Sequence, residues 1–139
     1  MVTKLILKFP TFYKLFTLEC DASGMVVGSV LSQEGRLVAF FSEKLNKAKK
    51  KYSPYDLELY ALVHSLRNWR HYLLPKEFVV FTYNQALSYI NTQEKLSNRH
   101  LKWMKYLQAF VLTINYKKRK LKKVADALSR RMFQGPLQE

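Results

Sequence analysis

Residues 16–24 of the chain, FTLECDASG, predict a strand that ends in a carboxylate at a tight turn. Apolar Phe16, Leu18 and Cys20 alternate with polar residues, which is the period of a half-buried strand. The small residues after Asp21 end in a glycine and predict the turn. Asp21 is therefore expected at the rim of a sheet, either as a cap of the turn or as a metal-binding carboxylate.

Two further strands are expected directly after this one. An apolar run over residues 25–31 is separated from another, residues 36–42, by Glu34-Gly35, which predicts a hairpin turn. The chain is thus expected to open with three antiparallel strands.

A long helix follows, since Ser53 can cap it, Pro54 suits its first position, and Asp56 lies three residues after the cap. The helix is expected to run to about Leu74. A strand over residues 78–83 comes next, and the strand–helix–strand order predicts a right-handed crossover with parallel pairing.

The rest of the chain predicts alternating helices and one more strand. In order, these are a short helix over 85–91, a helix over 99–109 capped by Asn98, a strand over 110–116 and a final helix over 123–131. The fold class is therefore α/β, with a five-stranded mixed sheet of three antiparallel and then parallel strands flanked by helices. We expect residues 1–13 to be a lead-in segment, residues 14–131 the domain and residues 132–139 a tail.

The composition favours a polyanionic partner. The 139 residues carry a net charge of +14, which points first to nucleic acid and second to an acidic membrane surface. A hydrophobic content of 48% is enough for a core. The single cysteine, Cys20, fits a reducing compartment, and no apolar run is long enough to span a membrane.

Candidate chemistry rests on carboxylates at the ends of predicted elements. The sequence has no glycine-rich phosphate loop, no paired Cys-His metal spacing and no nucleophile elbow. Asp21, Glu58 and Asp126 remain, and hard cations such as Mg²⁺ take oxygen ligands. Glu58 is either a solvated helical glutamate or a carboxylate beside the sheet edge near the small Ala61 and Ser65.

Four motifs occur together and in order: residues 18–24, Tyr52-Ser53 with Glu58, residues 69–73, and residues 124–130. With them the chain resembles the ribonuclease H domain of the reverse transcriptase in Ty3/gypsy-type long-terminal-repeat retrotransposons, most closely those of plants. The resemblance implies a ribonuclease H-like fold and two Mg²⁺ (or Mn²⁺) ions that hydrolyse the RNA strand of RNA–DNA hybrids. It also implies that Asp21, Glu58 and Asp126 are catalytic metal ligands, the first, second and fourth of four.

The third ligand of that family is absent. The chain has Thr82-Tyr83-Asn84 where the family usually has Thr-Asp-His or Thr-Asp-Asn. A tyrosine, with a pKa near ~10, is neutral at pH 7 and does not replace a carboxylate on a hard cation. The strand period is expected to turn Asn84 to the face opposite residue 83. Cleavage is therefore expected to be weak or absent.

Two non-catalytic functions stand beside the nuclease: a silent nucleic-acid-binding domain and a structural subdomain of a polyprotein. The nucleic-acid contacts expected in the first case are Ser23, Lys49, Lys50, Lys117, Lys118, Arg119 and Lys120. Expected partners are an RNA–DNA hybrid or other nucleic acid and the polymerase and connection regions of a parent polyprotein, but no membrane. The expected location is intracellular, in a cytoplasmic particle or the nucleus.

Overall fold

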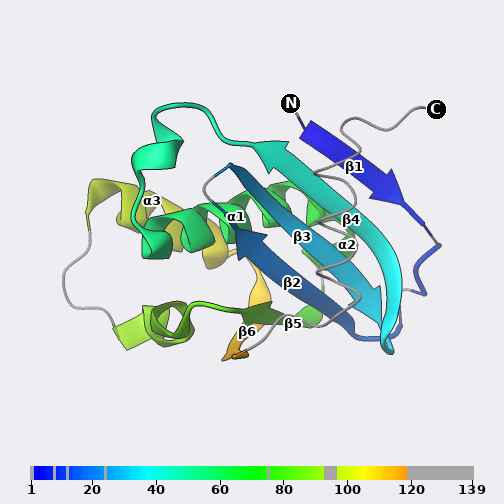
Figure 1. The fold of residues 1–139 in the computed structure, drawn as a ribbon. Coiled ribbons are helices and arrows are strands. Elements are labelled where there is room, and N and C mark those ends of the chain that lie inside the picture. Colours follow the sequence, from blue (N-terminus) through cyan, green and yellow to red (C-terminus); the bar gives the residue numbers. More distant parts are fainter. Residues whose placement is uncertain are drawn as a thin grey trace.

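The computed structural model describes residues 2–7, 9–11, 13–23, 25–74, 76–92 and 97–118. Asp126, Arg119, Lys120, the final helix and the tail predicted from the sequence lie outside the described residues. The elements in chain order are β1 (Val2–Ile6), β2 (Phe16–Ala22), β3 (Val26–Gln33), β4 (Arg36–Lys44), η1 (Lys49–Lys51), α1 (Pro54–Asn68), α2 (Arg70–Leu73), β5 (Glu77–Thr82), η2 (Gln85–Thr92), α3 (Asn98–Leu107) and β6 (Val111–Tyr116). Figure 1 shows them as a mixed sheet with helices packed against it.

The predicted antiparallel start is confirmed. β2 pairs with β3 and β3 with β4, both antiparallel. Glu34 and Gly35 form the hairpin turn with positive φ angles of 50° and 77°. Two consecutive positive φ values match the right-handed twist of the flanking strands, which is why a glycine at the second position suits this turn.

The predicted parallel pairing after the long helix is also confirmed. The chain passes from β4 through α1 and α2 to β5, which lies parallel to β2, and β6 lies parallel to β5. The sheet order among the described strands is β1-β4-β3-β2-β5-β6. The carboxyl ends of β2 and β5 consequently meet at one edge, beside the start of α1 (Figure 1).

The expectation of five strands is wrong, because the segment set aside as a lead-in contributes a sixth. β1 pairs antiparallel with β4. A short strand with a lysine is typical of a protected sheet edge, and its weak hydrophobic pattern hides it in the sequence. The Lys4 ammonium donates to the carbonyl of Asn68 at 3.2 Å and lies 4.9 Å from the ring centroid of Trp69, at the end of α1.

Two helix boundaries differ from expectation. The long helix is interrupted at Trp69, whose φ and ψ are −104° and 16°, instead of continuing to Leu74. The indole of Trp69 is fully buried and donates to Ser29 Oγ at 3.2 Å, so a long-range contact fixes the break. α3 is capped by Ser97, which accepts from the His100 amide, instead of by Asn98.

The sheet has two different faces. α1 packs on one face over the main core, which includes Leu18, Leu31 and Leu62, all fully buried. A smaller cluster of Val30 and Phe40 lies on the opposite face, since neighbouring strand residues point to opposite sides. The strand register places Leu5, Phe40, Val30, Glu19 and Phe81 in one row across that second face. The row continues from Phe81 to Asn115 on β6, so Glu19 is a carboxylate with an apolar neighbour on each side.

No helix in the described part of the chain is long and apolar enough to cross a membrane.

The contacts of Lys4 predict a measurable contribution of β1 to stability. Lys4→Met removes a cation from the C-terminal end of α1 and is expected to lower Tm by about 2–4 °C. Lys47→Met, at an exposed loop position, is the control for loss of a surface charge. Equal melting temperatures for the two variants would contradict a role for β1 in holding α1.

Candidate functional site

The candidate site lies where β2 and β5 both end. Asp21 is the last residue but one of β2, and Tyr83 directly follows β5. The parallel register pairs Glu19 with Phe81, and Asp21 and Tyr83 each lie two residues further along. The pairing thus brings Asp21 and residue 83, where the family resemblance implies a first and a third ligand, to the same edge.

Glu58 reaches this edge from α1. Its side chain is buried, with 7% of the residue exposed, and its Oε1 accepts from the backbone amide of Ala22 at 3.1 Å. The helix is started by Ser53, whose Oγ accepts from the Asp56 amide at 3.1 Å, so that Glu58 falls in the second turn. Of the two alternatives for Glu58, the structure supports the carboxylate beside the sheet edge.

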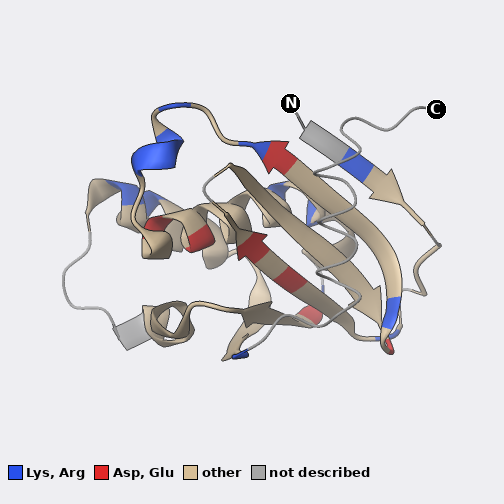
Figure 2. Cartoon of the chain, viewed as in Figure 1, with Lys and Arg blue, Asp and Glu red and all other residues tan. Residues whose placement is uncertain are grey.

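A shallow cavity of about 310 Å³ lies between these elements. Its lining residues are Ala22, Ser23, Pro54, Leu57, Glu58, Tyr83 and Asn84. The residues expected at the first, second and third ligand positions are therefore next to or within a single depression. Figure 2 shows the acidic segments of β2 and of the first turns of α1 at this end of the molecule, with the basic η1 and the start of α3 near them.

Tyr83 does not point freely into the cavity. Its hydroxyl donates to Glu19 Oε2. The Glu19 side chain is only 3% exposed, and its other oxygen lies 3.7 Å from the ammonium of Lys117. Because a buried carboxylate needs compensating donors, Tyr83 and Lys117 stabilise Glu19 in its place on the sheet.

The expectation for Asn84 is wrong. Asn84 lines the same cavity as Tyr83 instead of facing away from it. β5 ends at Thr82, so the strand period no longer applies at residue 84. Asn84 Oδ1 accepts from the Leu87 amide at 3.3 Å at the start of η2. Its carbonyl oxygen therefore serves as a helix cap.

The predicted nucleic-acid contacts have different surroundings. Lys50 is exposed, whereas the ammonium of Lys49 lies 5.1 Å from the ring centroid of Tyr60. Lys118 is exposed, but the ammonium of Lys117 lies 3.8 Å from the ring centroid of Phe81. The hydroxyl of Ser23 accepts from the amides of residues 25 and 26 and so closes the turn after β2.

The described residues supply only part of the ligand set expected for a two-ion centre. Among them, no group of three or more His, Cys, Asp or Glu side chains is arranged to hold a metal ion. Asp21 and Glu58 supply carboxylates at the edge, Tyr83 supplies a neutral hydroxyl already bound to Glu19, and Asp126 lies outside the described residues. The described part of the chain thus offers two of the carboxylates that the family resemblance implies.

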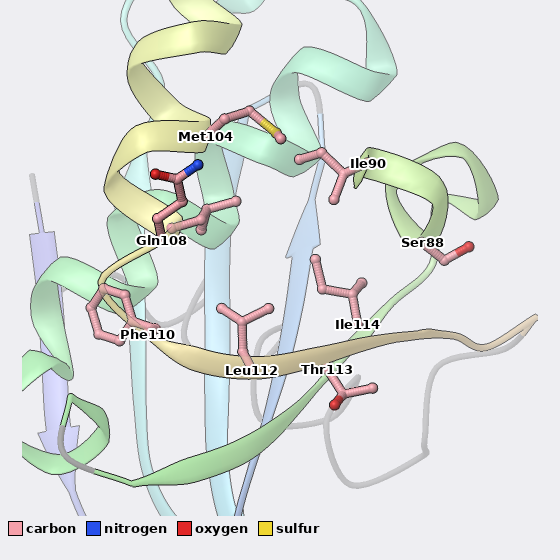
Figure 3. Close-up of a pocket in the computed structure, with 9 residues that line it drawn as sticks. Ser88, Ile90, Met104, Gln108, Phe110, Leu112, Thr113 and Ile114 are labelled. Carbon is pink, nitrogen blue, oxygen red and sulfur yellow. The ribbon is translucent and has the colours of Figure 1, made fainter. Parts of the chain in front are cut away.

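A larger cavity of about 390 Å³ lies elsewhere, between η2, α3 and β6. Figure 3 shows Ile90, Leu112 and Ile114 pointing into it. Its lining contains no acidic, basic or histidine side chain. This cavity is lined by apolar side chains together with Ser88, Gln108 and Thr113, and it is separate from the carboxylates.

Two sets of residues were missed in the sequence. Glu19 lies two positions before Asp21, on the same face of β2. The alternation of side chains along a strand could have predicted that the two carboxylates share a face. Asp56 accepts from His100 at 2.5 Å and from Arg99 at 3.2 Å. These contacts hold the basic start of α3 against the start of α1. They join residues that are far apart in the chain, so no local sequence pattern predicts them.

Comparisons with known proteins agree with this geometry. A family model described as the RNase H-like domain found in reverse transcriptase matches residues 11–110. The chain is 38% identical over 125 residues to the Retrovirus-related Pol polyprotein from transposon 297 of Drosophila melanogaster, covering 90% of this chain and 12% of that protein. It is 36% identical over 139 residues to the Transposon Tf2-3 polyprotein of Schizosaccharomyces pombe, covering 94% of this chain and 10% of that protein. The chain thus spans about a tenth of these relatives.

Solved structures share the fold. The foamy viral protease-reverse transcriptase dRH in complex with double-stranded DNA matches with a TM-score of 0.68 at 17% identity, over 81% of this chain and 21% of that one. LC11-RNase H1 in complex with an RNA/DNA hybrid matches with a TM-score of 0.61 at 16% identity, over 81% of this chain and 91% of that one. The expected fold class is confirmed, apart from the strand count.

The contact between Tyr83 and Glu19 predicts a loss of stability when the hydroxyl is removed. Tyr83→Phe leaves a buried carboxylate with one donor fewer and is expected to lower the free energy of unfolding by about 1–3 kcal/mol. Urea denaturation measures it, with Tyr13→Phe, at a side chain 85% exposed, as the control. If both variants unfold at the same urea concentration, the Tyr83 hydroxyl does not stabilise Glu19.

Proposed function

Because the chain belongs to the RNase H-like domains found in reverse transcriptases, with relatives among transposon polyproteins, we propose that it binds RNA–DNA hybrids and cleaves their RNA strand weakly or not at all. The observation that carries the proposal is the place of Tyr83 at the shared end of β2 and β5, where the family resemblance implies a carboxylate.

Charge supports the binding part of the proposal. The net charge of +14 favours contacts with phosphates, and the exposed Lys50 and Lys118 are free of competing ion pairs among the described side chains. One structural neighbour was solved with an RNA/DNA hybrid and another with double-stranded DNA. Phosphate contacts position a duplex without reading its sequence, which suits a domain that acts along a whole transcript.

The chemistry of the family explains why we expect a low rate of cleavage. Where carboxylates hold two divalent ions, the ions activate water and stabilise the charge that develops on the phosphate. Asp21 and Glu58 are the described candidates for holding Mg²⁺ or Mn²⁺. A neutral tyrosine hydroxyl that donates to Glu19 offers such an ion no negative charge.

A structural role within a polyprotein is the alternative. This alternative is favoured by the small share of its relatives that the chain matches, which is 12% of the transposon 297 polyprotein and 10% of the Tf2-3 polyprotein. A purely structural domain would bind no hybrid by itself, so the binding experiments below separate the two functions.

Restoring a carboxylate is expected to restore cleavage. Tyr83→Asp should raise Mg²⁺-dependent cleavage of a labelled RNA–DNA hybrid by roughly 100-fold or more over the parent, since a metal ligand acts on transition-state charge. Asp21→Asn in the Tyr83→Asp background is the control and should abolish the gain without changing the fold. A Tyr83→Asp protein that is folded, binds Mg²⁺ and stays inert would refute the missing-ligand explanation.

Binding is expected to weaken steeply with salt. Replacing Lys49 and Lys50 by Gln should reduce the slope of log K against log salt by roughly 1–2, about 0.9 for each lost phosphate contact. Lys76→Gln, beside the opposite end of β5, is the matched control and should leave the slope unchanged. Fluorescence anisotropy at a series of salt concentrations gives the slopes, and equal slopes for all three proteins would place the phosphates elsewhere.

A further inference from the structure

We propose that η1 and α3 together form a basic surface that binds the phosphate backbone of a nucleic-acid duplex, beside the acidic edge of Asp21 and Glu58. The surface consists of four exposed lysines, two from each element: Lys50, Lys51, Lys102 and Lys105. Neither lysine of α3 is among the nucleic-acid contacts expected from the sequence. The inference rests on the hybrid binding proposed above and deepens it, because it states which side of the molecule meets the duplex.

α3 carries its basic residues in one row. Arg99, Lys102 and Lys105 follow each other at intervals of three residues, so their side chains are neighbours on successive turns of the helix. All three are exposed, whereas Trp103 and Leu107 are buried. The row therefore faces solvent along the helix.

η1 lies beside the start of this row. Tyr52 directly follows η1, and its ring centroid lies 4.1 Å from the guanidinium carbon of Arg99 and 6.1 Å from the ring centroid of Trp103. Figure 2 shows the basic segments of η1 and α3 next to each other at one end of the molecule. The aromatic contacts thus join two basic segments that are far apart in the sequence into one surface.

The four lysines keep their positive charge uncompensated by the carboxylates near this aromatic group. Asp56 pairs with Arg99 and His100. Glu43 accepts from the hydroxyl of Tyr60. No ion pair between described side chains includes any of the four lysines. Their charge is therefore available to attract a polyanion.

The stability of α3 does not account for its charges. The first turn of α3 contains no acidic residue, and Arg99 places a cation where the helix dipole favours negative charge. Like charges one turn apart on a helix also repel each other. Phosphates that lie along the row would offset this repulsion, and a nucleic-acid backbone supplies them at close and regular spacing.

The basic surface is continuous with the acidic edge through the start of α1. Pro54 and Glu58 line the cavity at that edge, whereas Asp56 between them contacts α3. A duplex that reaches the edge can therefore extend over the basic surface. The carboxylates of the edge repel phosphates unless cations are bound there, so we expect the affinity for the duplex to come from this surface.

The experiment compares two double variants of the full chain. Lys102→Gln with Lys105→Gln removes two charges from the surface and keeps good helix formers in α3. Arg36→Gln with Lys76→Gln is the matched control, since it removes two charges at the other end of the sheet, where β4 and β5 begin. Fluorescence anisotropy gives the affinity for a labelled RNA–DNA hybrid at a series of salt concentrations, and circular dichroism with Tm establishes that both variants are folded.

The α3 variant should reduce the slope of log K against log salt by roughly 2, about 0.9 for each lost phosphate contact. Its loss of affinity between roughly 50 and 200 mM salt should then be about tenfold smaller than that of the parent. The control variant should keep the slope of the parent. The same reduction is expected with double-stranded DNA of the same sequence, because phosphate contacts carry no sequence information.

Two results would overturn the inference and leave the proposed function intact. If the folded α3 variant has the affinity and slope of the parent, α3 lies outside the interface with the duplex and its charges serve another polyanion. If both double variants reduce the slope equally, net charge and not this surface sets the binding. A parent that binds no hybrid at any salt concentration is a different result, since the proposed function itself then fails and the inference falls with it.

Discussion

The parallel pairing of β2 with β5 is the constraint on which the candidate site depends. It aligns the carboxyl ends of two strands that are separated in sequence by the whole of the β3–β4 hairpin and α1. Asp21 and Tyr83 meet only because of this alignment. Glu58 joins them because the Ser53 cap starts α1 beside the same edge and Ala22 donates to its carboxylate. A different register would separate all three.

The same pairing has a consequence on the second face of the sheet. It sets Glu19 opposite Phe81, and the pairing of β5 with β6 then delivers Lys117 to the same place. A buried carboxylate between apolar neighbours would normally destabilise a sheet. Here one donor comes from the residue after β5 and the other from the residue after β6, so the polar contact also links the ends of three strands.

Local signals made most of the fold predictable. The alternation in β2, the Glu34-Gly35 turn and the Ser53-Pro54 start of α1 each depend on neighbouring residues alone, and all three are confirmed. The features that sequence reasoning missed depend on distant partners. The long helix is interrupted at Trp69, whose indole donates to the distant Ser29. β1 is held in the sheet by its antiparallel pairing with β4.

The site shows the same division. The family resemblance pointed to position 83 as the anomaly, and the geometry puts that residue at the edge. Sequence reasoning grouped Lys117 with the phosphate-contacting lysines, because composition carries no information on where an ammonium points. Only the tertiary contacts with Glu19 and Phe81 distinguish it from Lys118. The roles of Asp21 and Glu58 as ligands stay predictions.

A carboxylate and a tyrosine at position 83 would have opposite effects on the charge around Glu19. A carboxylate there would add negative charge beside Asp21 and remove the hydroxyl donor from Glu19, leaving Lys117 as the described partner of that buried group. A tyrosine reverses both effects, since it lowers the charge of the edge and completes the hydrogen bonding of Glu19. A tyrosine at position 83 is thereby compatible with a well-packed sheet, because its hydroxyl completes the hydrogen bonding of the buried Glu19 and leaves the fold that builds the edge in place.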